Sequence, residues 1–256
     1  MNELPLTYIL IAGSFIAAAG GLLGSFALLR RMALVGDAMS HVALPGITLA
    51  LIFHFDILLG SIVFLVLGSF FIWAVENKTK LPVDTVVGVF FTLSLALGAL
   101  LATKEEIIDA LFGNIVNLNL SDFWIAVLLS SVIVGIVIYF SRRFTLSFIS
   151  ADLARSVGEN PALLELLFLL VFAIAVAVGI KLVGALLMGS VIIIPAATSR
   201  NIARSFNGYL LGSALFGVLG AVLSILISTS YNFSPGPVFI LAEGFLFSIS
   251  FFFRKK

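Results

Sequence analysis

The chain has 256 residues, of which 61% are hydrophobic and only 11% are charged, and its mean hydropathy is +1.24. Soluble domains carry about 25% charged residues, so 14 basic and 13 acidic side chains could not cover the surface of a soluble protein of this length. The composition excludes a soluble, disordered or coiled-coil protein, and the net charge of +1 excludes a nucleic-acid partner, because phosphate binding needs concentrated basic surface.

Nine segments are candidates for membrane-spanning helices, each of which needs about 20 mostly apolar residues. The second and the seventh are short or contain an interior proline, Pro45 or Pro195, so one of them is expected to be broken or re-entrant. Charged loops, among them Arg142-Arg143, are expected to separate the spans. We therefore predict an all-α, polytopic transmembrane helical bundle of eight to nine spans, forming one domain over residues 1–256. The nine segments are 6–29, 38–54, 57–75, 83–102, 121–140, 162–180, 182–199, 208–228 and 236–253.

The distribution of basic residues predicts the orientation in the membrane, because cytoplasmic loops are enriched in Lys and Arg. With the amino terminus outside and nine alternating helices, only Lys104 and Lys181 lie outside, and the carboxyl terminus is cytoplasmic. The opposite orientation would invert this distribution. The basic residues that this topology places inside are Arg30, Arg31, Lys78, Lys80, Arg142, Arg143, Arg155, Arg200, Arg204, Arg254, Lys255 and Lys256.

Two stretches are not expected to span the membrane. Residues 105–119 are predicted to be external, amphipathic and surface-associated. Residues 150–161 are predicted to form a short cytoplasmic helix, with Ser150 or Asp152 as its amino-terminal cap and Gly158 and Pro161 ending it. Such a helix is either a docking surface for a partner or an ordinary solvated connector.

The segment 36–46 carries the most informative polar residues. Asp37 and His41 are four residues apart, so on a helix they share one face. A carboxylate inside a bilayer costs a few kcal/mol unless it is paired or faces a cavity, and carboxylate with imidazole suits zinc, manganese or iron. The alternatives are an Asp–His hydrogen bond or an Asp37 helix cap. Pro45-Gly46 weakens the helix one turn later, as in transport helices that free backbone groups around a site.

Other features of the chain have weaker interpretations. Two pairs of small residues, Gly20 with Gly24 and Gly208 with Gly212, predict close helix packing. His54 and Asp56 could collect cations in an external loop, although a solvated loop is the simpler interpretation. The absence of cysteine excludes disulfides, thiolate metal sites and cysteine nucleophiles.

The sequence resembles the membrane permease subunits of the zinc/manganese/iron-type ABC importers, the ABC-3 family. The matching blocks keep the family order over nearly the whole chain, and six of them in order make a specific signature. They are Gly36 to Gly46, Val83 to Gly88, Leu111 to Ile115, Val183 to Leu187, Ile194 to Thr198 and Ser234 to Pro237.

The resemblance implies a fold similar to that of the vitamin B12-type importer permeases and a homodimer in the cell membrane. It implies that Asp37 and His41 contact and gate the metal. It also implies that the helix near residues 150–161 docks into a cleft of a cytoplasmic ABC ATPase, two copies of which serve the dimer, while an extracytoplasmic binding protein delivers the metal. The residues that match the coupling helix are Ser150, Asp152, Ala154, Arg155 and Gly158.

The sequence contains no Gly-Lys dipeptide, so it has no Walker A loop to bind ATP phosphates, and no His-Glu-x-x-His zinc-protease motif. We therefore expect a transport permease rather than an enzyme, without a cofactor of its own. Its cargo would be zinc or manganese, with iron also compatible.

Glu243 departs from the family pattern, which has small or apolar residues at this point near the middle of the last span. It could be protonated, paired with Ser224 or Ser248, or part of the transport path. An alternative function is a proton-coupled secondary metal carrier, in which Asp37, His41 and Glu243 form a proton relay.

Overall fold

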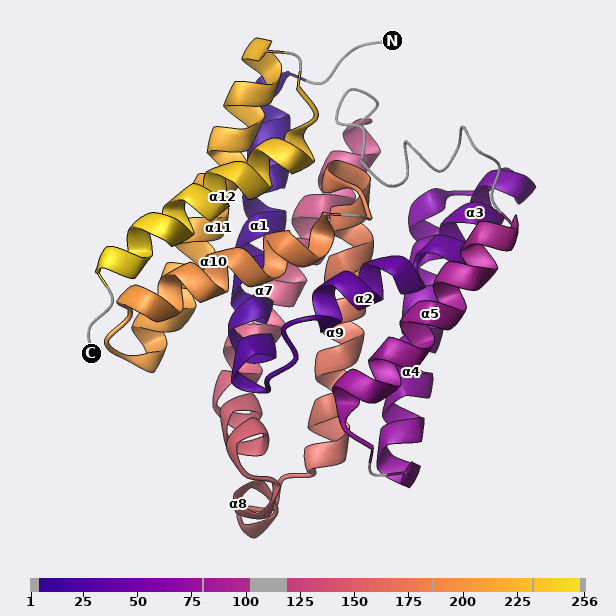
Figure 1. Cartoon of the computed structure of the whole chain (residues 1–256), viewed down its shortest axis with the longest axis vertical. Helices are drawn as coiled ribbons and strands as arrows, with labels where there is room; N and C mark the ends of the chain where they lie inside the picture. Colours follow the sequence, from indigo (N-terminus) through magenta and orange to yellow (C-terminus); the bar gives the residue numbers. More distant parts are fainter. Residues whose placement is uncertain (1–4, 80, 102–118, 186, 232, 254–256) are drawn as a thin grey trace.

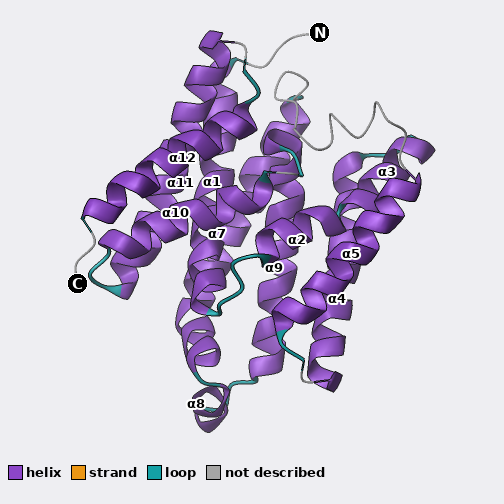
Figure 2. Ribbon diagram, in the orientation of Figure 1, coloured by secondary structure: helices purple, strands orange, loops and turns teal. Residues whose placement is uncertain are grey.

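The computed structural model describes residues 5–79, 81–101, 119–185, 187–231 and 233–253. Within these ranges the chain is helical and contains no strand, as Figure 2 shows, so the predicted all-α fold is confirmed. The helices, labelled in Figure 1, are α1 (Leu6–Leu29), α2 (Val35–Val42), α3 (Leu44–Phe53), α4 (Ile57–Thr79), α5 (Val83–Leu101), α7 (Leu120–Ile149), α8 (Ala151–Ser156), α9 (Pro161–Val183), α10 (Met188–Ile202), α11 (Phe206–Tyr231) and α12 (Pro235–Phe252).

Eight segments of the described chain are long and apolar enough to cross a membrane, one of them being α2 and α3 taken together. The remaining candidate, predicted at residues 182–199, is α10. This helix has 15 residues and is about 22 Å long at about 1.5 Å per residue, which is less than the hydrocarbon core of about 30 Å. The prediction of eight to nine spans is confirmed.

The helix α7 is longer than the sequence predicted. The interpretation of Arg142 and Arg143 as part of a loop was wrong, because α7 continues through both to Ile149. Charged side chains mark where a chain leaves the hydrocarbon, and backbone hydrogen bonding continues beyond that point. The Arg143 guanidinium lies 5.5 Å from the Phe140 ring centroid and 3.1 Å from Glu159, which fixes this extension to the segment after α8.

The boundary between α9 and α10 lies later than predicted. The sequence placed it at the charged residue Lys181, but α9 continues to Val183 and α10 begins at Met188. Gly184 follows α9 with a φ of 88°, a conformation that L-residues with a side chain rarely adopt. The break between α9 and α10 is therefore determined by the conformation of Gly184 and not by the charge of Lys181.

Small residues let the central helix α1 approach its neighbours α7, α10 and α11 closely (Figure 1). A β-carbon on Gly24 would overlap the carbonyl oxygen of Ile192 in α10, and Gly20 faces the side chain of the same residue. In the second predicted pair, Gly212 lies against Ser199 of α10. The predicted close helix packing is therefore confirmed at Gly20, Gly24 and Gly212, but not at Gly208, where a β-carbon would meet only Ser205 just before α11.

The helix α8 lies at the opposite end of the molecule from the start of α1, and α1, α4 and α7 run toward that end (Figure 1). The basic residues at their ends, among them Arg30, Lys78 and Arg142, therefore gather on the side that carries α8. Which side faces the cytoplasm stays a prediction. The predicted amphipathic segment 105–119 lies, apart from Asn119, outside the described residues.

Candidate functional site

The predicted pair lies on α2, a helix of eight residues that is followed directly by α3. The two helices meet at Ala43. Pro45 explains the break, because it has no N–H to donate to the carbonyl of His41 four residues earlier. One of the two proline-containing spans was expected to be broken, and it is the second, whereas Pro195 lies inside α10. The His41 carbonyl, two residues before Ala43, lacks the usual helical donor four residues later.

Asp37 and His41 lie on the same face of α2, with 4.0 Å between Asp37 Oδ1 and His41 Nε2. This distance is too long for a hydrogen bond, and no side chain caps the amino end of α2, so neither structural alternative is present. Two atoms that each lie about 2.1 Å from one metal ion at a tetrahedral angle are about 3.4 Å apart. The pair can thus contact one metal ion after small side-chain rotations.

The two side chains differ strongly in exposure. The Asp37 side chain is 56% exposed in this protomer and the His41 side chain 11%. The His41 ring packs edge-on against Phe91 of α5, with 5.0 Å between ring centroids, and its buried Nδ1 has no hydrogen-bond partner among the described residues. The imidazole is therefore fixed by packing, while the carboxylate remains open to an ion.

Glycines bring α10 directly against the backbone of the pair. A β-carbon on Gly36 would lie 3.1 Å from the Cα of Gly189, and one on Gly189 would lie 2.7 Å from the Cα of Asp37. The sequence reasoning missed Gly189 and Phe91, because neither belongs to a motif that contains the pair. The only sequence signal is Gly189 itself, at the start of a short helix.

The described residues contain no group of three or more His, Cys, Asp or Glu side chains placed to hold a metal ion. The pair on α2 would therefore supply two ligands per protomer. Water, a backbone carbonyl or a second chain would have to supply the others. Two protein ligands suit brief coordination, because an ion held by few ligands is released readily.

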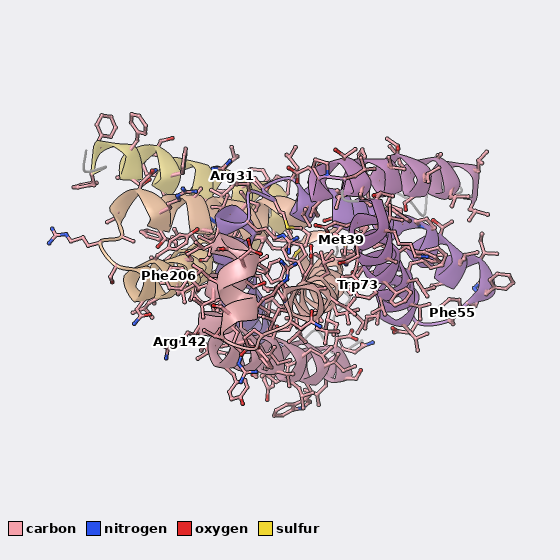
Figure 3. The ribbon with its side chains drawn as sticks, turned by 90° about the horizontal axis from the view of Figure 1, so that it is seen from below. Arg31, Met39, Phe55, Trp73, Arg142 and Phe206 are labelled. Atoms are coloured by element: carbon pink, nitrogen blue, oxygen red, sulfur yellow. The ribbon has the colours of Figure 1, made fainter. Side chains whose placement is uncertain are left out.

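The second predicted cation site has a structural explanation. His54 ends α3 in a left-handed conformation with a φ of 56°, and Asp56 Oδ1 accepts a hydrogen bond of 3.0 Å from the backbone N–H of Leu59 in α4. Viewed from the α8 end, Phe55 lies at the edge of the molecule, whereas Met39 of α2 projects near its middle (Figure 3). This loop therefore shapes the α3–α4 turn, away from the pair.

Glu243 is fully buried in α12, where Gly220 of α11 leaves room for its carboxylate. Neither carboxyl oxygen has a hydrogen-bond partner among the described residues. The predicted pairing with Ser224 or Ser248 was wrong, because these hydroxyls donate to the backbone carbonyls of Pro235 and Gly244. Glu243 forms no cluster with the pair on α2, so the proton relay of the carrier alternative is not supported.

The predicted polar helix is α8, but it is shorter than predicted: it ends at Ser156, and Pro161 begins α9. Ser150 caps it by accepting a hydrogen bond of 3.3 Å from the Leu153 N–H. Asp152 and Arg155 form an ion pair of 2.8 Å on its exposed face, with side chains 92% and 65% exposed. Ala154 is buried and seats the helix against the bundle.

After α8 the chain turns at Gly158, whose φ is 83°. The side chain of Asn160 then caps α9. The helix α8 thus presents a small polar surface with apolar residues at its edges, Leu153 and Val157, both exposed.

Comparisons with known proteins match nearly the whole chain. A family model described as the ABC 3 transport family matches residues 5–254. The manganese import system permease protein ScaB of Streptococcus gordonii is 30% identical over 251 residues, which cover 96% of this chain and 90% of that protein. The high-affinity zinc uptake system membrane protein ZnuB of Haemophilus influenzae is 27% identical over 253 residues, which cover 96% of this chain and 97% of that protein.

The fold is similar to that of a solved structure, PsaBC from Streptococcus pneumoniae in complex with a Fab. The two chains superpose with a TM-score of 0.85 at 29% sequence identity. The match covers 98% of this chain and 92% of the other.

Proposed function

The chain belongs to the ABC 3 transport family, and we propose that it is the membrane-spanning subunit of an ATP-driven importer of divalent transition metal ions. The observation that carries this proposal is the match over residues 5–254 together with the Asp37–His41 pair on the broken second span. The chain is a transport permease, and ATP hydrolysis would occur in a separate ATPase subunit.

The cargo that fits the pair best is manganese or zinc. One carboxylate oxygen and one imidazole nitrogen suit both ions. The relatives ScaB and ZnuB are named for manganese and zinc, at 30% and 27% identity, so sequence similarity does not separate the two. Selectivity would lie partly in the protein that delivers the metal.

We infer a homodimer from the exposure of Asp37. Its side chain is 56% exposed in a single protomer, although it lies on a segment long and apolar enough to span a membrane. A carboxylate facing lipid costs a few kcal/mol. A second copy of the chain would cover this face and enclose an aqueous path, which removes that cost and places a second pair on the same path.

The helix α8 is the proposed docking site for the cytoplasmic ATPase, of which a dimeric permease would bind two copies. Its capped, ion-paired surface is the part of the chain that extends furthest from the amino-terminal end (Figure 1). ATP-driven movement of the ATPase subunits would displace α8 and rock the protomers between outward- and inward-facing states. An extracytoplasmic metal-binding protein would dock at the opposite end of the bundle.

Uptake into vesicles tests the function directly. The chain is reconstituted with its ATPase and its metal-binding protein, and uptake of manganese, zinc and iron is measured with ATP, without ATP and with a proton gradient alone. We expect uptake of one or more of these ions only when both ATPase and ATP are present. Uptake by the chain alone in a proton gradient would contradict the proposal and would support the proton-coupled carrier instead.

A further inference from the structure

A compact charged cluster lies between the proposed coupling helix and the metal pair. Arg30, the carboxyl-terminal cap of α1, donates hydrogen bonds to Glu76 of α4 at 2.9 Å and to Glu165 of α9. Its guanidinium also lies 5.2 Å from the ring centroid of Phe148 in α7. The side chains of Arg30, Glu76 and Glu165 are between 11% and 17% exposed, so four helices meet at one largely buried cation.

The cluster holds both helices that flank α8. Phe148 precedes Ser150, the cap of α8, by two residues, and Glu165 lies in the second turn of α9. The indole of Trp73 in α4 adds a hydrogen bond of 2.7 Å to the carbonyl of Ala162. A displacement of α8 therefore reaches Arg30 through two helices at once.

On its other side, Arg30 is tied to the helix that carries the metal pair. Only residues 30–34 separate α1 from α2, and backbone hydrogen bonds tie this connector to the end of α1 and to the start of α2. The Met32 N–H donates to the Ala27 carbonyl at 2.8 Å, and the Val35 N–H donates to the Met32 carbonyl at 3.2 Å. Met32 is buried. A movement of Arg30 is therefore transmitted to α2 and is not absorbed by a loose loop.

We propose that Arg30, held by Glu165 and Glu76, is the positioning residue that couples displacement of α8 to the helix bearing Asp37. This inference rests on the proposed function. Two carboxylates share one guanidinium here, and Glu76 Oε2 is buried without a partner among the described residues. A planar guanidinium can bridge two carboxylates at fixed angles, which a lysine ammonium cannot do. Arg30 thus acts through the geometry of its contacts, without touching the metal.

The test is the number of metal ions imported per ATP hydrolysed by the reconstituted complex. Arg30→Lys and Glu165→Gln are expected to keep ATPase assembly and hydrolysis within about twofold of the wild type, while uptake falls by about tenfold or more. Hydrolysis and uptake that fall in proportion would overturn the proposal, since that result indicates a purely structural cluster. Unchanged uptake in both variants would also overturn it.

The chain provides a matched control in Arg143, which also lies over a phenylalanine ring and pairs with an acid beside α8. Its partner Glu159 does not connect to the α1–α2 connector. Arg143→Lys should therefore leave the ratio of uptake to hydrolysis unchanged. If the wild-type complex imports no metal, the proposed function fails. If the wild type imports metal and Arg30→Lys imports as many ions per ATP hydrolysed as the wild type, only this inference fails.

A distance measurement keeps the proposal testable if a variant loses uptake through poor folding. The chain contains no cysteine, so spin labels can be placed on Leu34→Cys and on Ile149→Cys, the last residue before the cap of α8, both exposed positions outside the docking helix. With Arg30 present, the distance between the two labels of one protomer, measured in dimers with a single labelled protomer, should be the same with and without a non-hydrolysable ATP analogue. In Arg30→Gln the analogue should shift it. A nucleotide-dependent shift in the otherwise wild-type complex would contradict coupled movement.

Discussion

Gly189 at the start of α10 lies directly against the backbone of Asp37, so that a β-carbon on this glycine would lie 2.6 Å from the Asp37 amide nitrogen. Such a distance is shorter than real Cβ contacts allow. The backbone position of the metal pair therefore depends on a residue without a side chain in a different helix.

We predict that Gly189→Ala displaces Asp37 and lowers the rate of metal uptake while the complex still assembles. A misplacement of about 1 Å can cost as much as about 100-fold in rate, so we expect a loss of about tenfold or more. The initial rate of uptake into vesicles measures the effect. Gly135→Ala is the control, because a β-carbon there has nothing within 4 Å, and equal uptake in the two variants would show that the contact is unimportant.

The metal pair itself is tested by Asp37→Asn and His41→Ala. Each variant removes one of the two candidate ligands, and even losing the partner of a metal ligand costs about 10- to 100-fold in metal affinity. We expect uptake to be abolished in both variants. Co-purification with the ATPase should be unchanged, because His41 lies on α2 and packs against Phe91 of α5, away from α8. Normal uptake in both variants would remove the site assignment.

The sequence predicted those features that depend on neighbouring residues. The apolar run 6–29 matches α1 because charges begin directly after it. The interior prolines Pro45 and Pro195 predicted a break in one of two spans, and the structure has it at Pro45. The spacing of Asp37 and His41 placed both on one helix face. Each of these signals is contained within a few turns of chain.

Features that depend on distant segments could not be predicted. Arg30 meets its two acids 46 and 135 residues along the chain, so no local pattern shows the cluster. The continuation of α7 past Arg142 and Arg143 was missed because charged residues indicate where the chain leaves the membrane, and the helix does not end there. Whether a buried carboxylate such as Glu243 finds a partner depends on how three helices pack.

Glu243 is predicted to lower the stability of the protein without contributing to transport. A buried polar group without a partner costs about 1–3 kcal/mol, so Glu243→Met, which keeps a similar length, should raise the free energy of unfolding by about that amount. Uptake should stay within about twofold of the wild type. Thermal unfolding in detergent and vesicle uptake measure the two effects.

Glu243→Gln serves as the companion variant, because it keeps the shape and the unmet hydrogen-bonding need of the side chain. It should gain less stability than Glu243→Met. Complete loss of uptake in both variants would give Glu243 a place in the transport path.

Close packing of α1 against α10 predicts a large penalty at Gly24. Gly24→Ala places a methyl group into the carbonyl of Ile192, and overpacking of this kind costs about 1–3 kcal/mol. Gly135→Ala, on an open face of α7, should instead be neutral or stabilising by up to about 1 kcal/mol, because alanine favours a helix over glycine. Unfolding temperatures in one detergent compare the two variants, and equal values would show that α1 and α10 separate easily.

The turn after α8 provides a test of docking that does not alter any exposed side chain. Gly158 has a φ of 83°, and a β-carbon there meets nothing within 4 Å, so Gly158→Ala acts only through backbone strain of about 1–2 kcal/mol. Because this turn orients α8 relative to α9, we expect about 5- to 30-fold weaker binding of the ATPase, the factor that corresponds to such a strain. The dissociation constant of the detergent-purified permease for its ATPase measures this loss of affinity.

The control is Gly244→Ala, because Gly244 has equally open surroundings but no left-handed φ. This variant should bind the ATPase with wild-type affinity. Equal affinities for both variants would mean that the orientation of α8 does not determine docking.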